Sequence, residues 1–140
     1  MPGTSRSYAL SISEELFKLS TESVRLHSND TLRYQTLAQL LMKRLGQDAA
    51  ADGHDPELLR DYLEKLPTRG SVRIHLNISR TSADSLVDIK KRLSREIGNR
   101  LTVGDAVAIL LYDYLVERSA TRVLSKLRQR ELDDEPASKA

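Results

Sequence analysis

The sequence predicts a mainly α-helical fold that contains a short two-stranded antiparallel β-ribbon. Residues 8–12 and 72–78 alternate apolar and polar side chains, which is the pattern of a strand with one buried face. Each stretch is followed by two segments whose apolar residues recur at helical spacing. A single strand leaves its backbone N–H and C=O groups without partners, so we expect the two strands to pair within the chain.

The second strand gives the clearer pattern. Between residues 72 and 78 every second residue is apolar, and the polar residues between them are Arg73, His75 and Asn77. After a break at residues 80–82, a helix is predicted that stops at Gly98. The next helix begins at Thr102, which is spaced from Asp105 as in a capping box.

The N-terminal third has the same order of elements. Its strand at residues 8–12 precedes a helix that we expect to end at residues 28–30, and a second helix that ends at Gly46. With an offset of 70 residues the helices align, for example Leu16 with Leu86, which indicates a degenerate internal duplication. The strands align only if the second unit has about four extra residues between strand and helix.

We predict a single intertwined domain that spans residues 1–140. Its parts are a first unit, a linker with a connecting helix, a second unit and a basic helical extension, at residues 6–46, 47–69, 70–117 and 118–140. The motif at residues 55–57 (Asp-Pro-Glu) starts the connecting helix, because an Asp cap and a Pro in the first turn favour initiation. The polar residues 131–140 are expected to form a disordered tail.

The composition excludes several kinds of site. The chain has 140 residues and no cysteine, so it contains neither a disulfide nor a thiolate metal site. It lacks the run of about 18 apolar residues that a membrane span requires, and the apolar core of a signal peptide. We therefore expect a cytoplasmic protein without a membrane partner. The formal net charge of +2 does not by itself indicate a nucleic-acid partner.

No catalytic or metal-binding pattern is recognisable. The three histidines are isolated and share no spacing such as H-E-x-x-H. The sequence has neither a glycine-rich phosphate loop nor a Gly-x-Ser-x-Gly elbow. We expect no enzymatic activity, no cofactor and no bound metal. Tyr112 and Tyr114 lie beside leucines on a predicted helix and are interpreted as packing residues.

The order strand, helix, turn, helix resembles the ribbon-helix-helix family over residues 6–46 and 70–117. The resemblance implies that two units pair their strands, interlock four helices beneath them and insert the ribbon into the major groove of DNA. Two units in one chain form a tandem pseudo-dimer, an arrangement similar to TraY-type relaxosome accessory proteins and to the agrobacterial virulence-region protein that binds the T-DNA overdrive sequence. This likeness implies an accessory role in conjugative or T-DNA transfer, with a relaxase or another transfer protein as a partner.

The polar face of the ribbon supplies the predicted base contacts. An arginine can donate twice to guanine, an asparagine can pair with adenine, and a histidine can donate or accept. The first strand offers only small side chains, so we expect unequal DNA half-sites or one half read by shape. The alternative is that these side chains only face water. The predicted base contacts are Arg73, His75, Asn77, Ser7, Ala9 and Ser11.

The predicted phosphate contacts come from the N-termini of the second helices, whose free N–H groups and positive dipole end suit an anion. Arginines that flank the strands are expected to add contacts, although for each of them a solvated surface role is the alternative. Asp30 is unfavourable so close to a phosphate. The predicted phosphate contacts are Arg100, Thr102 and Val103 in the second unit, Thr31 and Arg33 in the first, and the flanking Arg6, Arg69 and Arg80.

Two other functions are compatible with the sequence. A transcriptional repressor or plasmid-maintenance regulator would use the same DNA chemistry, whereas a helical protein-interaction module would not bind DNA. If both units pair within one chain, the protein is a monomeric pseudo-dimer in solution. If the first unit is not a true one, the second strand must pair with another chain.

Overall fold

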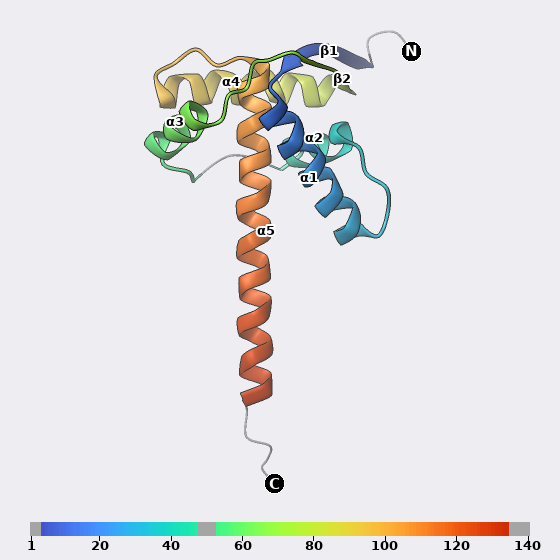
Figure 1. The fold of residues 1–140 in the computed structure, drawn as a ribbon, viewed down its shortest axis with the longest axis vertical. Helices are drawn as coiled ribbons and strands as arrows, with labels where there is room; N and C mark the ends of the chain where they lie inside the picture. The colour runs from blue at the N-terminus through green and yellow to red at the C-terminus, as the bar shows by residue number, and fades with distance from the viewer. Residues whose placement is uncertain (1–3, 48–52, 135–140) are drawn as a thin grey trace.

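The computed structural model describes residues 4–47 and 53–134, and it confirms the mainly helical fold with a two-stranded antiparallel ribbon. In chain order the elements are β1 (Ser5–Ile12), α1 (Glu14–Thr31), α2 (Leu37–Leu45), α3 (Pro56–Lys65), β2 (Val72–Ser79), α4 (Arg80–Ile97) and α5 (Val103–Asp134). The ribbon lies at one end of the molecule, and α5 runs from beneath it to well beyond the other helices (Figure 1).

β1 and β2 pair along their whole length. Every residue of one strand has a partner on the other, from Ser5 opposite Ser79 to Ile12 opposite Val72. The predicted pairing of the two strands is therefore confirmed. Because successive residues of a strand point to opposite faces, the ribbon presents one face to the helices and the other to solvent.

Both strands lead directly into a helix that a serine caps. The Leu16 N–H donates to Ser13 Oγ at 3.0 Å, and the Ser82 N–H donates to Ser79 Oγ at 3.2 Å. Each of the two helices then has 18 residues. The predicted insertion of about four residues between strand and helix in the second unit is therefore wrong.

The two units repeat with an offset of 66 residues rather than 70. Ser79 follows Ser13 by 66 residues, and Thr102, which caps α5, follows Thr36, which caps α2, by the same number. The error amounts to about one helical turn. Leucines spaced by four residues lie on one face of a helix, so they match nearly as well one turn out of register.

The same turn joins the two helices of each unit. Ser28 Oγ accepts a hydrogen bond from the Gln35 N–H at 2.9 Å, and Ser94 Oγ accepts one from the Leu101 N–H at 3.1 Å. These two pairs are again related by 66 residues. The repeat therefore extends to side chains that fix the loop as well as to the helices.

α1 continues through residues 28–30, where a stop was predicted, and ends at Thr31. Leu32 ends it in the left-handed conformation, with φ 58°, at the position where Gly98 has φ 83° in the second unit. Leucine is not a residue that signals this conformation, so the true end of α1 could not be predicted from the sequence. The second helix of this unit begins only at Leu37.

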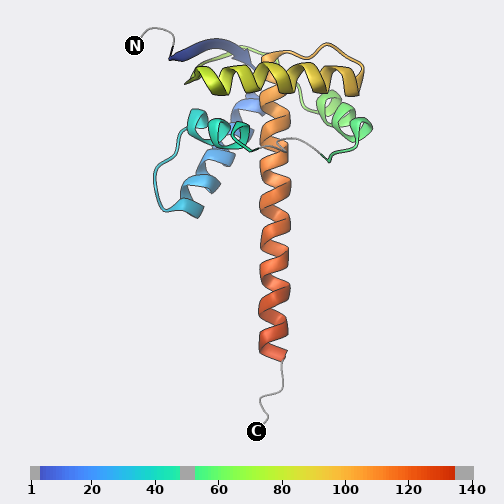
Figure 2. The same ribbon diagram turned by 180° about the vertical axis from the view of Figure 1, so that it is seen from behind.

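The core lies between the ribbon and the interlocked helices of the two units. α1 packs against α5, while α2 packs against β2, α4 and α5 (Figures 1 and 2). α5 passes through the centre, where residues 106–111 are each at most 2% exposed. Large side chains that are almost completely buried include Ile12, Leu16, Leu40, Leu41, Leu76, Ile78, Leu86, Leu93 and Leu110.

The linker contains the predicted connecting helix, α3. Asp55 caps it and Pro56 is its first residue. The Tyr62 hydroxyl donates to the Ala108 carbonyl of α5 at 3.0 Å, and the Arg60 guanidinium donates to the Ile97 carbonyl of α4. α3 therefore covers the outer side of the second unit.

α5 is one continuous helix through Asp134. Its second half extends beyond the other elements (Figure 1), and the side chains of residues 123–133 are all exposed. Residues 131–134, expected to be disordered, continue this helix, and the rest of the predicted tail lies outside the described residues. No helix within the described ranges has a segment long and apolar enough to cross a membrane.

Candidate nucleic-acid interface

The solvent-facing side of the ribbon brings together all six predicted base-contact residues. The register places Ser7 opposite Asn77, Ala9 opposite His75 and Ser11 opposite Arg73. All six side chains are exposed. The opposite face carries Ile12, Leu76 and Ile78, which are buried in the core. Core packing therefore fixes which face of the ribbon points outwards.

The larger polar groups on this face all belong to β2. The Ser7 hydroxyl donates to Asn77 Oδ1 at 3.4 Å, a long contact across the ribbon. Within the described part of the chain, the side chains of Arg73 and His75 make no hydrogen bond or ion pair. These donors are therefore available to an external partner.

A groove of about 330 Å³ lies beside the ribbon where α5 begins. It is lined by Ala9 and Ser11 of β1, by Arg69, and by Thr102 and Val103 at the helix start, among others. The predicted contacts Arg69, Thr102 and Val103 are thus next to the exposed face of the ribbon.

A carboxylate lies at this helix start. Asp105 Oδ2 accepts from the Thr102 N–H at 2.9 Å, and the Asp105 N–H donates to Thr102 Oγ1 at 3.1 Å, which confirms the predicted capping box. Thr68 Oγ1 also donates to Asp105 Oδ1 at 2.6 Å. The negative charge of Asp105 opposes anion binding here, and the exposed guanidinium of Arg69 favours it.

A second groove, of about 320 Å³, lies where α2 begins. Leu37 of α2, Ile74 and His75 of β2, and Phe17 of α1 are among its lining residues. Here the capping box is uncharged: the Gln39 N–H donates to Thr36 Oγ1 at 3.1 Å, and the Thr36 N–H donates to Gln39 Oε1 at 2.8 Å. The positive end of the α2 dipole thus faces solvent beside the ribbon without a carboxylate in its first turn.

The start of α2 was not predicted from the sequence. The predicted contacts Thr31 and Arg33 lie at the C-terminal end of α1, on the side away from the ribbon (Figure 1). Free carbonyl groups and the negative dipole end are found there, so placing these two residues at a helix N-terminus was wrong. The spacing of Thr36 and Gln39 is that of a capping box and would have identified the true start.

The remaining predicted arginines are all exposed. Arg6 lies at the start of β1, with its guanidinium carbon 4.9 Å from the centre of the Tyr8 ring. Arg80 is the first residue of α4, and Arg100 lies in the turn between α4 and α5. None of the three forms an ion pair with another described residue.

No protein-family model, curated protein or solved structure matches this chain.

The interface is built from side-chain hydrogen-bonding groups and helix ends. Among the residues that the structure describes, no three His, Cys, Asp or Glu side chains lie close enough together to hold a metal ion. The ribbon therefore presents a row of hydrogen-bond donors and acceptors. The N-terminus of one helix lies on each side of it, α5 on one side and α2 on the other.

Proposed function

We propose that the protein binds double-stranded DNA sequence-specifically by inserting the β1–β2 ribbon into the major groove. The observation that carries this proposal is the exposed face of the ribbon. Six exposed side chains lie there in three cross-strand pairs, while the opposite face of the ribbon is buried in the core. The major groove is about 12 Å wide and accepts a two-stranded ribbon. Its base edges present a distinct donor and acceptor pattern for each base pair.

In this proposal the two strand-helix-helix units form a tandem ribbon-helix-helix pseudo-dimer. The constant offset of 66 residues supports it, since it relates Ser13 to Ser79 and Thr36 to Thr102. The packing of α1 on α5 and of α2 on α4 also supports it, because in both cases a helix of the first unit packs against a helix of the second. Both strands of the ribbon come from one chain, so we expect a monomer in solution.

Base recognition would be concentrated on β2. Arg73 would donate to guanine O6 and N7, Asn77 would pair with adenine N6 and N7, and His75 would lie between them. Opposite them, Ser7 and Ser11 would offer hydroxyl groups without blocking close approach. The phosphates on either side would meet the free N–H groups where α2 and α5 begin.

The test is a binding selection from randomised duplex DNA, followed by titration at two salt concentrations. We expect affinity to fall steeply as salt rises, since bound phosphates release counterions. Arg73→Ala should cost about 1–3 kcal/mol of binding free energy and relax the preference at one guanine. Lys126→Ala, on the projecting part of α5, is the matched control and should keep the base preference. Absence of salt-dependent binding would instead favour a protein-interaction module.

For the biological process, we propose an accessory role in conjugative or T-DNA transfer, which rests on the family resemblance alone. A repressor would bind DNA with the same ribbon. Capture of a relaxase or another transfer protein by the tagged full-length chain would support the accessory role. Repression of a reporter that carries the selected site, without such capture, would support the regulator.

A further inference from the structure

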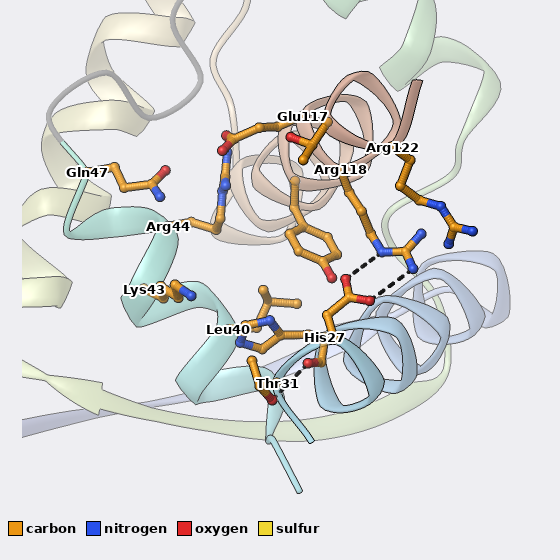
Figure 3. A pocket seen from close by; sticks show the side chains of 12 residues that line it. His27, Thr31, Leu40, Lys43, Arg44, Gln47, Glu117, Arg118 and Arg122 are labelled. Carbon is orange, nitrogen blue, oxygen red and sulfur yellow. Dashed lines mark hydrogen bonds and ion pairs between the residues drawn. The ribbon is translucent and has the colours of Figure 1, made fainter. Parts of the chain in front are cut away.

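A pocket of about 580 Å³ opens between α1, α2 and α5, on the side of α1 that lies away from the ribbon. Figure 3 shows Lys43 and Arg44 on the wall formed by α2, and Arg118 and Arg122 on the wall formed by α5. His27 of α1 lies at the base. The volume is within the range of about 300–1,000 Å³ that small-molecule sites usually have.

The internal repeat shows that this pocket is specific to the first unit. At the offset of 66 residues, His27 corresponds to Leu93 and Arg44 to Leu110, which are both completely buried in the core. His27 and Arg44 are also about 95% buried, since each is 5% exposed. Burying polar groups where the fold accepts leucine is unfavourable for stability. Arg44 has carboxylate partners that offset this cost, whereas the His27 ring makes no side-chain hydrogen bond within the described residues, so the presence of His27 points to a role other than packing.

Two arginines, in three ion pairs with carboxylates, fix the walls of the pocket. The Arg44 guanidinium contacts Asp113 and lies 2.7 Å from Glu117 Oε2. Arg118 Nε lies 2.7 Å from Asp30 Oδ2, which holds the pKa of the Asp30 carboxyl below its usual range. These carboxylates are thus occupied by arginines of the protein itself.

The pocket also contains polar groups that make no hydrogen bond of normal geometry with the described residues. The His27 ring packs edge-on against Tyr114, with centroids 5.8 Å apart, and makes no side-chain hydrogen bond within the described residues. Burial, together with the nearby charge of Lys43, lowers the pKa of His27, so its ring is neutral at pH 7. The Tyr114 hydroxyl is buried and makes no hydrogen bond of normal geometry with the described residues.

Two cations stand on opposite sides of this pocket in Figure 3. Lys43 and Arg122 are exposed, and neither forms an ion pair with a carboxylate among the described residues. The neutral His27 ring lies between the two walls in the same view, and Tyr114 also lines the pocket. Positive charge at both ends with neutral polar groups between suits a ligand that carries two separated negative charges.

We propose that this pocket binds a small organic anion with two separated acidic groups, each a carboxylate or a phosphate. Lys43 would hold one acidic group, and Arg122 the other. The His27 ring and the Tyr114 hydroxyl would hydrogen-bond to the middle of the ligand. Such a ligand would join α1, α2 and α5, the three elements that meet at the pocket.

The experiment is calorimetric titration of the full chain, without DNA, with citrate and separately with inorganic pyrophosphate. We expect saturable one-to-one binding of at least one of them, and the one that binds identifies carboxylate or phosphate chemistry. Lys43→Ala and Arg122→Ala should each weaken binding about tenfold, the effect of losing one charge-assisted contact. Lys126→Ala/Arg128→Ala, which removes two cations of α5 outside the pocket, is the control and should bind as the wild type does.

His27→Leu gives the second test. It introduces the residue that the second unit has at the equivalent position, so it should keep the fold while it fills part of the pocket. We expect at least a tenfold loss of binding without a lower melting temperature. No saturable binding of either probe, or equal losses in the pocket variants and the control, would overturn the proposal. Because DNA is absent from these titrations, their outcome is independent of DNA binding by the ribbon.

Discussion

Single residues make the two units chemically unequal although their backbones follow the same plan. Ser20 and Ser23 are buried at positions where the second unit has Leu86 and Ile89. The hydroxyls of these serines donate to carbonyls of their own helix, Ser20 to Phe17 at 2.7 Å and Ser23 to Leu19 at 2.8 Å. Such bonds satisfy the buried hydroxyls. The interior of the first unit is therefore more polar than that of the second.

His27 should make the stability of the protein depend on pH. Its folded pKa is lowered by burial and by Lys43 and Arg33, with Asp30 acting in the opposite direction. A lowered folded pKa means that the unfolded chain binds the proton more readily. The stabilisation is therefore present above about pH 6.5, the unfolded value, and is lost as pH falls through the folded pKa.

We expect the free energy of unfolding to fall below pH 6.5 with a contribution from His27 of up to about 1.4 kcal/mol per pH unit. Urea denaturation between pH 7.5 and 5 measures this slope. His27→Leu should have a shallower slope, because it removes this one titrating group and leaves the rest of the sequence unchanged. Identical slopes for the two proteins would contradict the prediction.

Arg44 should be important for stability because of the carboxylate beside it. Asp113 is 8% exposed and also lies 2.6 Å from His54 Nε2. Arg44→Leu leaves that buried charge without its guanidinium, which should cost about 3–5 kcal/mol of unfolding free energy. Chemical denaturation of Arg44→Leu and of Arg44→Leu/Asp113→Asn tests the cause. The double variant should recover part of the loss, and equal losses would show that the buried charge is not responsible.

At the level of the secondary-structure elements, the segment that leads into β2 must pass very close to the backbone at the end of β1. The Ser13 N–H donates to the Thr68 carbonyl at 3.2 Å, so the chain before β2 lies against the end of β1. A Cβ at Gly70 would lie 2.6 Å from Ser13 Cα and 2.7 Å from the Ile12 carbonyl oxygen. Both contacts are to backbone atoms, which cannot rotate away.

Gly70→Ala should therefore lower the free energy of unfolding by about 1–3 kcal/mol, the usual cost of overpacking. Gly46→Ala is the matched control, because its Cβ would come no closer than 3.4 Å to a neighbour and its φ of −78° suits any residue. Thermal and chemical denaturation of both variants make the comparison. A loss for Gly46→Ala as large as that for Gly70→Ala would contradict the steric argument.

The sequence predicted the elements better than the places where they begin and end. Alternation along residues 72–78 identified the strand, its outward face and the need for a partner, because these follow from a period of two. The end of α1 could not be predicted, since Leu32 is held in its left-handed conformation without a glycine. The pocket could not be predicted either. It depends on residues of α1, α2 and α5 that only the tertiary fold brings together.

The two units give the whole molecule a pseudo-symmetric fold, but what packs on the outer side of each unit differs. α3 packs on α4 and α5 and covers the second unit, whereas the first unit has the open pocket beside α5. The exposed face of the ribbon also differs between the two units. It carries arginine, histidine and asparagine on β2, and two serines and an alanine on β1. A DNA site that matches this surface need not be symmetric.

We therefore predict that selected DNA sites will not be palindromic. One half-site should show strong base preferences from β2, and the other weak preferences or a preference for DNA shape. Sequencing of selected duplexes measures the information at each position. The variant Ser7→Arg places an arginine at the first-unit position that corresponds to Arg73 at the offset of 66 residues, so it should make the two halves more alike. A perfect palindrome selected by the wild-type protein would contradict the prediction.

The free half of α5 gives the molecule a stiff arm. From Arg122 to Asp134 the helix rises by about 18 Å at 1.5 Å per residue, in a direction away from the ribbon (Figure 1). A fluorophore or fusion partner attached near Asp133 would thus be held clear of a duplex bound at the other end. Energy transfer from such a label to a labelled duplex would report the orientation of the protein on its site.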